Sequence, residues 1–210
     1  IKIPLDDPIF NYQPSEEDYQ RIPDLLTDIE GYLEARAFCR EVAKLMPARD
    51  AFLFHGSAIA VDGNCYIFTA KSKTGKSTHS RLWRELLGDH AIMVNDDKPI
   101  IKVMETESMV FGTPWCGKHK LGNNISAPLK AICIIRQSSN INNKKIRKNI
   151  RKIEKTEALP MLIQQAHRPD DPAMTGKTLE LIDRMNVEYY CLDCNMDISA
   201  AELSYNTMKG

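Results

Sequence analysis

The sequence predicts a mixed α/β domain, with a mixed β-sheet flanked by helices. Two apolar, strand-like runs, 51–61 and 65–70, are joined by Asp62-Gly63-Asn64, which is a strong hairpin signal. The second run leads into a glycine-containing loop and then a helical pattern at 76–88. Hairpins beside a strand–loop–helix unit argue against a purely parallel sheet.

Composition limits the kind of protein. A chain of 210 residues with 43% hydrophobic content suits one globular domain over 51–210, preceded by a helical extension over 1–50. Lys plus Arg and Asp plus Glu number 28 each, so no overall charge favours nucleic acid or membrane as a partner. No apolar run approaches the roughly 20 residues of a membrane span, and no secretory signal opens the chain. Scattered cysteines favour a reducing, cytoplasmic location.

The first half of the chain contains the clearest elements. Residues 24–46 have helical periodicity. In the helix over 76–88, leucines share one side, Gly88 is placed to end the helix, and we expect His79 to face solvent or to cap. A short buried strand at 91–94 then ends in "NDDKP", and 99–104 continues in extended form.

The second half begins with a Pro- and Gly-rich loop, 111–124, in which Trp115 either stacks on a base or peptide or pins the turn to the core. A strand at 130–137 follows, and the last third is mostly helical. The basic run 142–155 places Ile146, Ile150 and Ile153 at helical spacing, which predicts a solvated amphipathic face, with docking of an acidic peptide as the alternative.

The C-terminal part has two local patterns. Ser199-x-x-Glu202 is a capping-box pattern and predicts the start of the last helix. Cys191-x-x-Cys194 has the spacing of half a zinc site, but no second pair completes it, so two cysteines near a strand end are expected.

The segment "AKSKTGKST" (70–78) is a phosphate-binding loop with one change. It matches G-x-x-x-x-G-K-[ST] except that Ala70 replaces the first glycine. Such a loop binds phosphate through backbone N–H groups at a helix N-terminus, so alanine is tolerated wherever φ is negative. Lys76 can reach the terminal phosphates and Ser77 can bind Mg²⁺. The candidate residues for binding ATP are Ala70, Lys71, Ser72, Lys73, Thr74, Gly75, Lys76, Ser77 and Thr78.

Acidic residues complete the predicted site. The strand 91–94 delivers Asp96 and Asp97, of which one carboxylate can hold Mg²⁺ and the other can accept a proton from an attacking hydroxyl. His55 lies in the strand-like run beside the one that feeds the loop, so its side chain can reach the loop region. The alternatives are a solvated acidic turn for the aspartates and a core position for His55.

Together, "HGSAIAVDGNCYIFTAKSKTGKSTHSRLW" and "VNDDKPI" resemble the catalytic domain of HPr kinase/phosphorylase, and especially its shorter serine-kinase relatives. The resemblance implies a fold like the phosphoenolpyruvate carboxykinase nucleotide domain. It implies catalytic roles for His55 and Lys76, a magnesium ligand in Ser77, proton acceptance by Asp97, and metal or phosphate contact by Asp96. Full-length relatives are hexameric, which implies a homo-oligomer.

The chain also departs from that family. Ala70 and Lys73 stand where full-length members have glycines, and the family's downstream acidic metal ligand has no counterpart. These departures argue against HPr as the acceptor and against phosphorolysis as a second activity. We therefore expect an ATP- and Mg²⁺-dependent kinase acting on a serine hydroxyl of a protein or peptide. The alternatives are a non-catalytic ATP-binding regulatory module and a carboxykinase-like enzyme acting on a small carboxylate.

Overall fold

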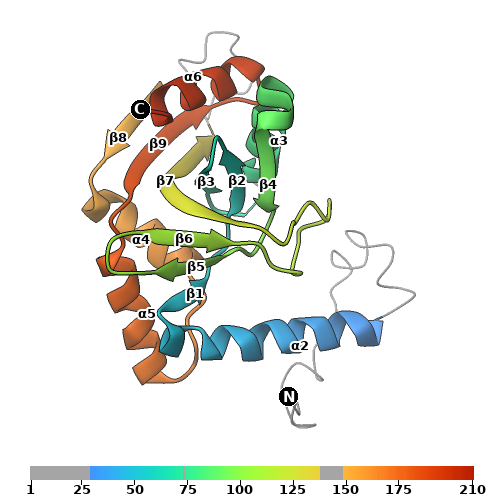
Figure 1. Cartoon of the computed structure of the whole chain (residues 1–210), viewed down its shortest axis with the longest axis vertical. Helices are drawn as coiled ribbons and strands as arrows, with labels where there is room; N and C mark the ends of the chain where they lie inside the picture. Colours follow the sequence, from blue (N-terminus) through green and yellow to red (C-terminus); the bar gives the residue numbers. More distant parts are fainter. Residues whose placement is uncertain (1–28, 73, 138–148) are drawn as a thin grey trace.

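A computed structural model describes residues 29–72, 74–137 and 149–210 (Figure 1). Most of the predicted N-terminal extension, together with Lys73 and Ile146, lies outside these residues. The described part of the extension contains α2 (Ile29–Leu45) and the short 3₁₀ helix η3 (Pro47–Arg49).

The rest of the described chain contains nine strands and five further helices. The strands are β1 (Ala51–Leu53), β2 (Ser57–Val61), β3 (Asn64–Thr69), β4 (Ala91–Asn95), β5 (Ile100–Val103), β6 (Ser108–Phe111), β7 (Ser126–Gln137), β8 (Asn149–Ile153) and β9 (Glu188–Cys194). The helices are α3 (Lys76–Leu87), η4 (Gly88–His90), α4 (Lys155–Gln165), α5 (Pro172–Arg184) and α6 (Ile198–Met208). None of the helices in the described ranges is long and apolar enough to cross a membrane.

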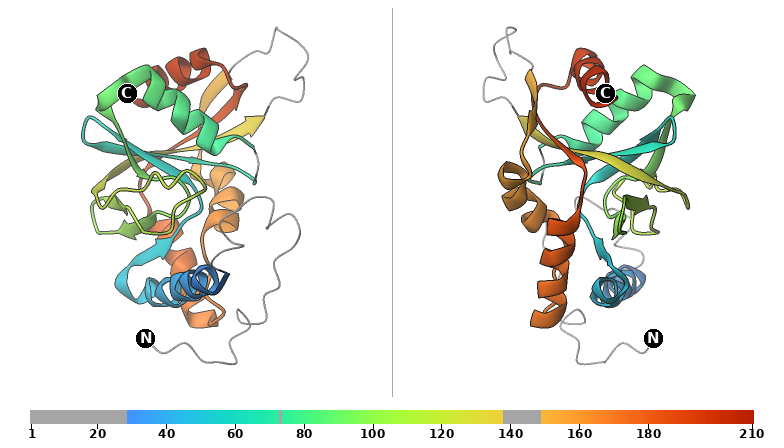
Figure 2. Two further views of the ribbon diagram at one scale, coloured as in Figure 1. Left: turned by 90° about the vertical axis from the view of Figure 1, so that its right-hand side faces the viewer. Right: turned by 60° about the vertical axis from the view of Figure 1, so that its left-hand side comes forward.

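The strands form one curled, mixed sheet, which confirms the predicted class. Its order is β1-β5-β6-β7-β3-β2-β4, with β9 also paired to β7 and β8 to β9. The β3–β7 and β7–β9 pairs are parallel, whereas the other pairs are antiparallel. In both views of Figure 2, α3 and α6 lie side by side at one end of the molecule, and α5 lies toward the other.

Alternation along β3 divides its buried side chains between two apolar clusters. On β3, Ile67 belongs to a cluster with Leu162 of α4, while the next residue, Phe68, packs with Trp83 of α3. Successive side chains of a strand point to opposite faces, so each face receives its own helices. The helix α3 is thereby fixed directly above the strand that leads into its N-terminus.

The predicted hairpin is present, but its first strand is broken. Asp62 and Gly63 have φ angles of 49° and 80°, as a tight β2–β3 turn requires. The expected continuous run 51–61 instead divides into β1, which pairs with β5, and β2, which pairs with β3. A Cβ atom on Gly56 would lie 2.8 Å from Ile67 Cγ2, so glycine permits the close approach at this break. His55 lies in the break, not within a hairpin strand.

The expected exposure of His79 is wrong. This side chain is buried, its Nε2 lies 2.9 Å from Ser204 Oγ of α6, and its ring packs edge-on against Phe68. Burial lowers the pKa of His79 to about 4. The helical pattern placed the leucines on one side of α3, but it could not show that α6, which is distant in the sequence, covers His79. Gly88 ends α3 with a positive φ of 56°, as expected.

Two predictions for the C-terminal third are also wrong. The helix α6 is capped by Asp197, whose carboxylate accepts a hydrogen bond from Ser199 N, so Ser199 lies inside the first turn. Residues 149–153 form strand β8, in which Ile150 and Ile153 pair with β9, not a helix. Pairing with the edge of the sheet outweighs the helical spacing of the isoleucines. Cys191 and Cys194 lie in β9, as the strand interpretation predicted.

Candidate functional site

The loop 70–78 joins β3 to the N-terminus of α3. Ala70 is fully buried and is not among the residues with positive φ, so its methyl group adds no backbone strain. Gly75 has a φ of 110° and forms the N-cap of α3. That conformation favours glycine and turns the chain sharply into the helix. The first turn of α3 contains no acidic residue, so its backbone N–H groups form an electropositive end.

Lys76 reaches back across the loop. Its Nζ donates a hydrogen bond to Ala70 O at 3.1 Å. Burial lowers the pKa of Lys76, and the negative charge of Asp97 opposes that shift. The amine therefore lies within electrostatic reach of Asp97 while it remains anchored to the loop.

A cleft of about 560 Å³ opens at this helix end. The residues that line it include Gly75 to Thr78, Asp96 and His119. Ser77 is exposed and Asp96 is only 6% exposed, so a hydroxyl and a buried carboxylate border the same space. Of the predicted acidic pair, Asp96 is among the residues that line this cleft and Asp97 is not.

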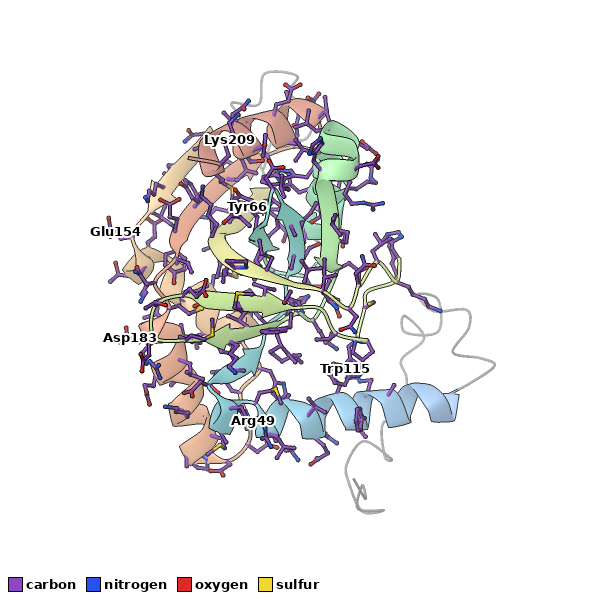
Figure 3. All side chains as sticks on the ribbon, viewed as in Figure 1. Arg49, Tyr66, Trp115, Glu154, Asp183 and Lys209 are labelled. Atoms are coloured by element: carbon purple, nitrogen blue, oxygen red, sulfur yellow. The ribbon has the colours of Figure 1, made fainter. Side chains whose placement is uncertain are left out.

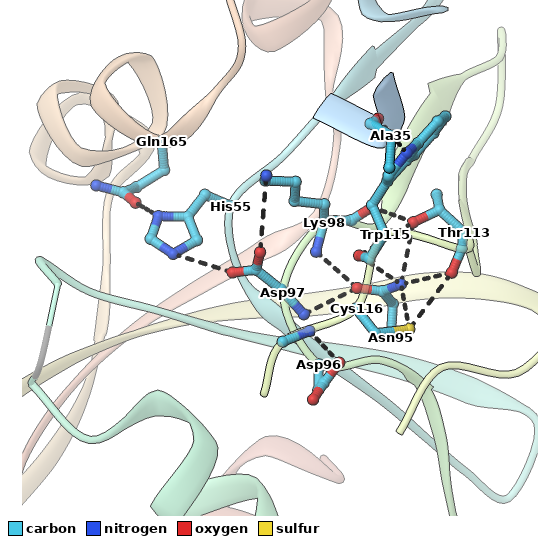
Figure 4. Close-up of polar contacts among 11 residues, drawn as sticks. Ala35, His55, Asn95, Asp96, Asp97, Lys98, Thr113, Trp115, Cys116 and Gln165 are labelled. Carbon is cyan, nitrogen blue, oxygen red and sulfur yellow. Dashed lines mark hydrogen bonds and ion pairs between the residues drawn. The ribbon is translucent and has the colours of Figure 1, made fainter. Parts of the chain in front are cut away.

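Asp96 is held by the loop that follows β6. Its Oδ1 accepts a hydrogen bond from Gly117 N at 2.8 Å (Figure 4). A Cβ atom at position 117 would lie 3.1 Å from Asp96 Oδ2, so glycine keeps the second carboxylate oxygen uncrowded. One oxygen of Asp96 is thus fixed by the backbone of the loop.

Asp97 points away from Asp96 and meets His55 and Lys98 (Figure 4). His55 Nε2 lies 3.4 Å from Asp97 Oδ1, and Lys98 Nζ lies 3.9 Å from Asp97 Oδ2. The Asp97 side chain is 30% exposed, far more than Asp96. Burial lowers the pKa of His55, and the nearby charge of Lys76 lowers it further, so the ring is neutral at pH 7.

Two residues that the sequence did not single out organise this side of the site. Asn95 is fully buried, and its Oδ1 accepts hydrogen bonds from Asp97 N at 2.8 Å and Lys98 N at 2.6 Å. Gln165 Oε1 lies 2.6 Å from His55 Nδ1 and fixes the ring from the end of α4. An Asn directly before the acids is a recognisable turn signal, whereas Gln165 is 110 residues from His55 and has no local signal.

The structure decides between the two interpretations of Trp115. Its Nε1 donates a hydrogen bond to Ala35 O at 3.2 Å, and its ring centroid lies 6.0 Å from that of Phe38. Figure 3 shows the side chain directly beside α2. Trp115 therefore pins its own loop to α2 and is not among the residues that line the cleft beside Gly75 to Thr78.

The predicted residues form two adjoining groups. Among the described residues, Gly75 to Thr78 and Asp96 line the cleft, while His55 and Asp97 contact each other beside it. Ala70 begins the loop, and its carbonyl oxygen accepts the hydrogen bond from Lys76. Thr74 Oγ1 donates a hydrogen bond to Lys71 O, so the Thr74 hydroxyl stabilises the turn. Lys71 and Ser72 are exposed and are not among the residues that line the cleft.

Comparison with known proteins gives only distant structural similarity. No family model matches the sequence, and no curated protein does. Among solved structures, the HPr(Ser) kinase/phosphatase from Coxiella burnetii aligns with a TM-score of 0.43 and 10% identity, covering 75% of this chain and 88% of that one. The function of the site must therefore be argued from this chain's own residues.

Proposed function

We propose that this protein transfers the γ-phosphoryl group of ATP, with Mg²⁺, to a serine hydroxyl of a protein or peptide. One observation carries the proposal. The positive end of α3, with Lys76 and Ser77, lines a single cleft together with Asp96, and Asp97 contacts His55 nearby. In that arrangement, a nucleoside triphosphate, Mg²⁺ and an acceptor hydroxyl would each have residues that can bind them.

Phosphate binding is supported by the loop and its lysine. The backbone N–H groups at the start of α3 lie where residues 75–78 line the cleft, and they favour a bound anion there. The Lys76 amine, tied to Ala70 O, adds a positive charge that is only partly hydrated. Because phosphoryl transfer depends mainly on positioning and electrostatic stabilisation, these are the groups that the reaction needs.

The residues present also fit Mg²⁺. This ion prefers oxygen ligands and keeps several waters, so one or two protein ligands and the phosphates are sufficient. Ser77 Oγ and the Asp96 oxygen that does not bond Gly117 N would be those ligands. When bound, the ion would neutralise charge on the β- and γ-phosphates. Within the described ranges no cluster of three or more His, Cys, Asp or Glu residues forms a metal site of its own.

Asp97 would act as the proton acceptor. Its carboxylate is partly exposed and lies beside a neutral His55 that Gln165 orients. The serine oxygen would bond to the γ-phosphorus as the bond from that phosphorus to the β–γ bridging oxygen breaks. ADP would leave, and Asp97 would take the hydroxyl proton. Lys76 would stabilise the charge on the transferred group.

Transfer of label from γ-labelled ATP tests the proposal. The protein is incubated with Mg²⁺ and an extract of its host, and labelled acceptors are analysed for phosphoserine. We expect labelled phosphoserine with the wild type and with Asp183→Asn, a surface control, but not with Asp97→Asn. Binding of ATP without any transfer would indicate a non-catalytic regulatory module. Label on a small carboxylate would indicate a carboxykinase-like enzyme.

A further inference from the structure

A second hollow adjoins the phosphate cleft and has no role in the chemistry above. This side groove has a volume of about 540 Å³ and is bordered by the turn after α3, by β4 and by the segment 120–123. It shares Arg84, Met93 and Leu121 with the phosphate cleft, so the two hollows are continuous.

Both walls show the direction in which the groove runs. Along α3, the shared Arg84 lies seven residues after Ser77, or roughly 10 Å farther from the helix N-terminus. Along β4, the phosphate cleft touches Met93 and is completed by Asp96, whereas the side groove touches Met93 and Ile92. The groove therefore leads away from the end of β4, where Asp97 and His55 lie.

The lining of the side groove offers apolar, cationic and anionic groups. Ile92 is 50% exposed, and Leu121 is partly buried, so a flat apolar group gains contact with both. Arg84 is half-buried and makes no ion pair with any residue in the described ranges, so its guanidinium remains for stacking or for a phosphate. Asp89 adds an exposed carboxylate that can accept hydrogen bonds from sugar hydroxyls.

The edge of β4 is not arranged to receive an extended peptide here. Asn123 Nδ2 donates to Met93 O at 2.8 Å, and Asn123 N donates to Val94 O at 3.1 Å. Strand addition needs a row of unpaired backbone groups, and Asn123 already occupies two of the carbonyls on β4. The groove is thus suited to a small, partly apolar ligand.

We propose that the side groove holds the ribose and base of the nucleotide. This inference rests on the proposed function, because phosphates at Ser77 and Thr78 leave the nucleoside to extend along α3. It also assigns the opposite side of the cleft, where His55 and Asp97 lie, to the entry of the acceptor hydroxyl. Nucleotide and acceptor then approach the γ-phosphate from different directions, as in-line transfer requires.

The test compares ATP with inorganic tripolyphosphate, which has the phosphates but no nucleoside. Calorimetry with Mg²⁺ gives both affinities for the wild type and for Ile92→Trp, which fills the groove from an exposed position. Asp89→Ala is the second variant, since it removes the exposed carboxylate offered to the sugar hydroxyls at a position that does not line the phosphate cleft. Leu179→Trp, at a 38% exposed position on α5, is the matched control. Thermal melting confirms that each variant is folded.

We expect the wild type to bind ATP at least about tenfold more tightly than tripolyphosphate. Ile92→Trp should remove that advantage and Asp89→Ala should reduce it, each changing tripolyphosphate affinity by less than about twofold, while Leu179→Trp changes neither affinity. Equal losses for both ligands, or no loss for either, would overturn the inference without contradicting the binding of phosphates at residues 75–78. If the wild type binds neither ligand, the proposed function fails and the inference fails with it.

Discussion

Asp96 and Asp97 are neighbours in the chain but belong to different regions of the site. Asp96 is buried at the phosphate-loop side, with one oxygen held by Gly117 N. Asp97 is partly exposed on the other side, beside His55 and Lys98. The buried, fixed carboxylate suits a metal ligand, and the exposed one suits a group that exchanges protons with an arriving hydroxyl. The turn at Asn95 creates this division by separating two adjacent side chains.

The largest effect should come from the phosphate-loop side. Lys76→Ala removes the amine that is anchored to Ala70 O, and we expect phosphoryl transfer to fall at least about 10³-fold. Steady-state transfer from labelled ATP measures it, with Lys102→Ala, an exposed position on β5, as control. Transfer within tenfold of wild type would mean that this lysine does not contact the reacting phosphates.

On the other side, Asp97→Asn should lower kcat by about 10²- to 10³-fold while leaving ATP affinity nearly unchanged. The amide keeps the shape of the side chain but cannot accept the hydroxyl proton. Rapid-quench measurement of one turnover, together with a binding titration, separates the two quantities. If Asp97→Asn weakened ATP binding and left the transfer step intact, the two aspartates would have the opposite roles.

A single substitution can disrupt the turn at Asn95 that separates Asp96 from Asp97. Asn95→Ala leaves Asp97 N and Lys98 N without their buried acceptor, and we expect a loss of about 2–3 kcal/mol in the free energy of unfolding. Urea denaturation measures the loss. Thr113→Ser retains the carbonyl and hydroxyl that accept from Asn95 Nδ2 and should change stability much less. Equal stability of Asn95→Ala and wild type would show that the turn forms without this side chain.

A smaller and more selective change is expected for Asp96→Asn. An amide oxygen can still accept the hydrogen bond from Gly117 N, so the fold is retained, but the ligand charge is lost. We expect the Mg²⁺ concentration for half-maximal transfer to rise about tenfold at fixed ATP. An unchanged magnesium requirement would remove Asp96 from the metal site.

The smallest effect concerns pH. Burial and Lys76 lower the pKa of His55 below its usual 6.5, so the ring takes up its proton only at more acidic pH. The resulting imidazolium would pair with the Asp97 carboxylate, and kcat should fall severalfold as the pH drops through that lowered pKa. His55→Gln should flatten this limb of the pH–rate profile.

The free energy of unfolding should also decrease at acidic pH. Between the folded and unfolded pKa values of His55 the unfolded chain binds more protons, so the free energy of unfolding falls as the pH drops below about 6.5. Denaturation at pH 7 and pH 5 measures the difference for the wild type and for His55→Gln. A pH midpoint above 6.5, in the pH–rate profile or in the pH dependence of the free energy of unfolding, would contradict a buried, neutral His55 ring.

How much of this site the sequence predicts depends on how local each contact is. The β2–β3 turn, the loop and the start of α3 follow from contiguous residues, and Gly75 adopts the backbone that its motif requires. The sequence also predicts that Asp96 and Ser77 border one cleft, because Asp96 directly follows strand β4 and Ser77 lies in the first turn of α3.

The rest depends on partners that are distant in the chain. His79 is buried because Ser204 of α6 lies against it, and Gln165 orients His55 from α4. Trp115 is placed by α2, some 80 residues earlier. Local propensity contains no information about such pairings, and for β8 it gave the wrong element because an edge of the sheet was available.

A crystal structure with Mg²⁺ and a non-hydrolysable ATP analogue would show whether the nucleotide binds at this cleft. We expect the triphosphate against the N–H groups of residues 75–78, with Lys76 Nζ on its outer phosphates and the metal between Ser77 Oγ and Asp96. We also expect Asp97 and His55 to face the γ-phosphate from the opposite side. A nucleotide bound elsewhere, or a metal ion held away from Asp96, would contradict the proposed site.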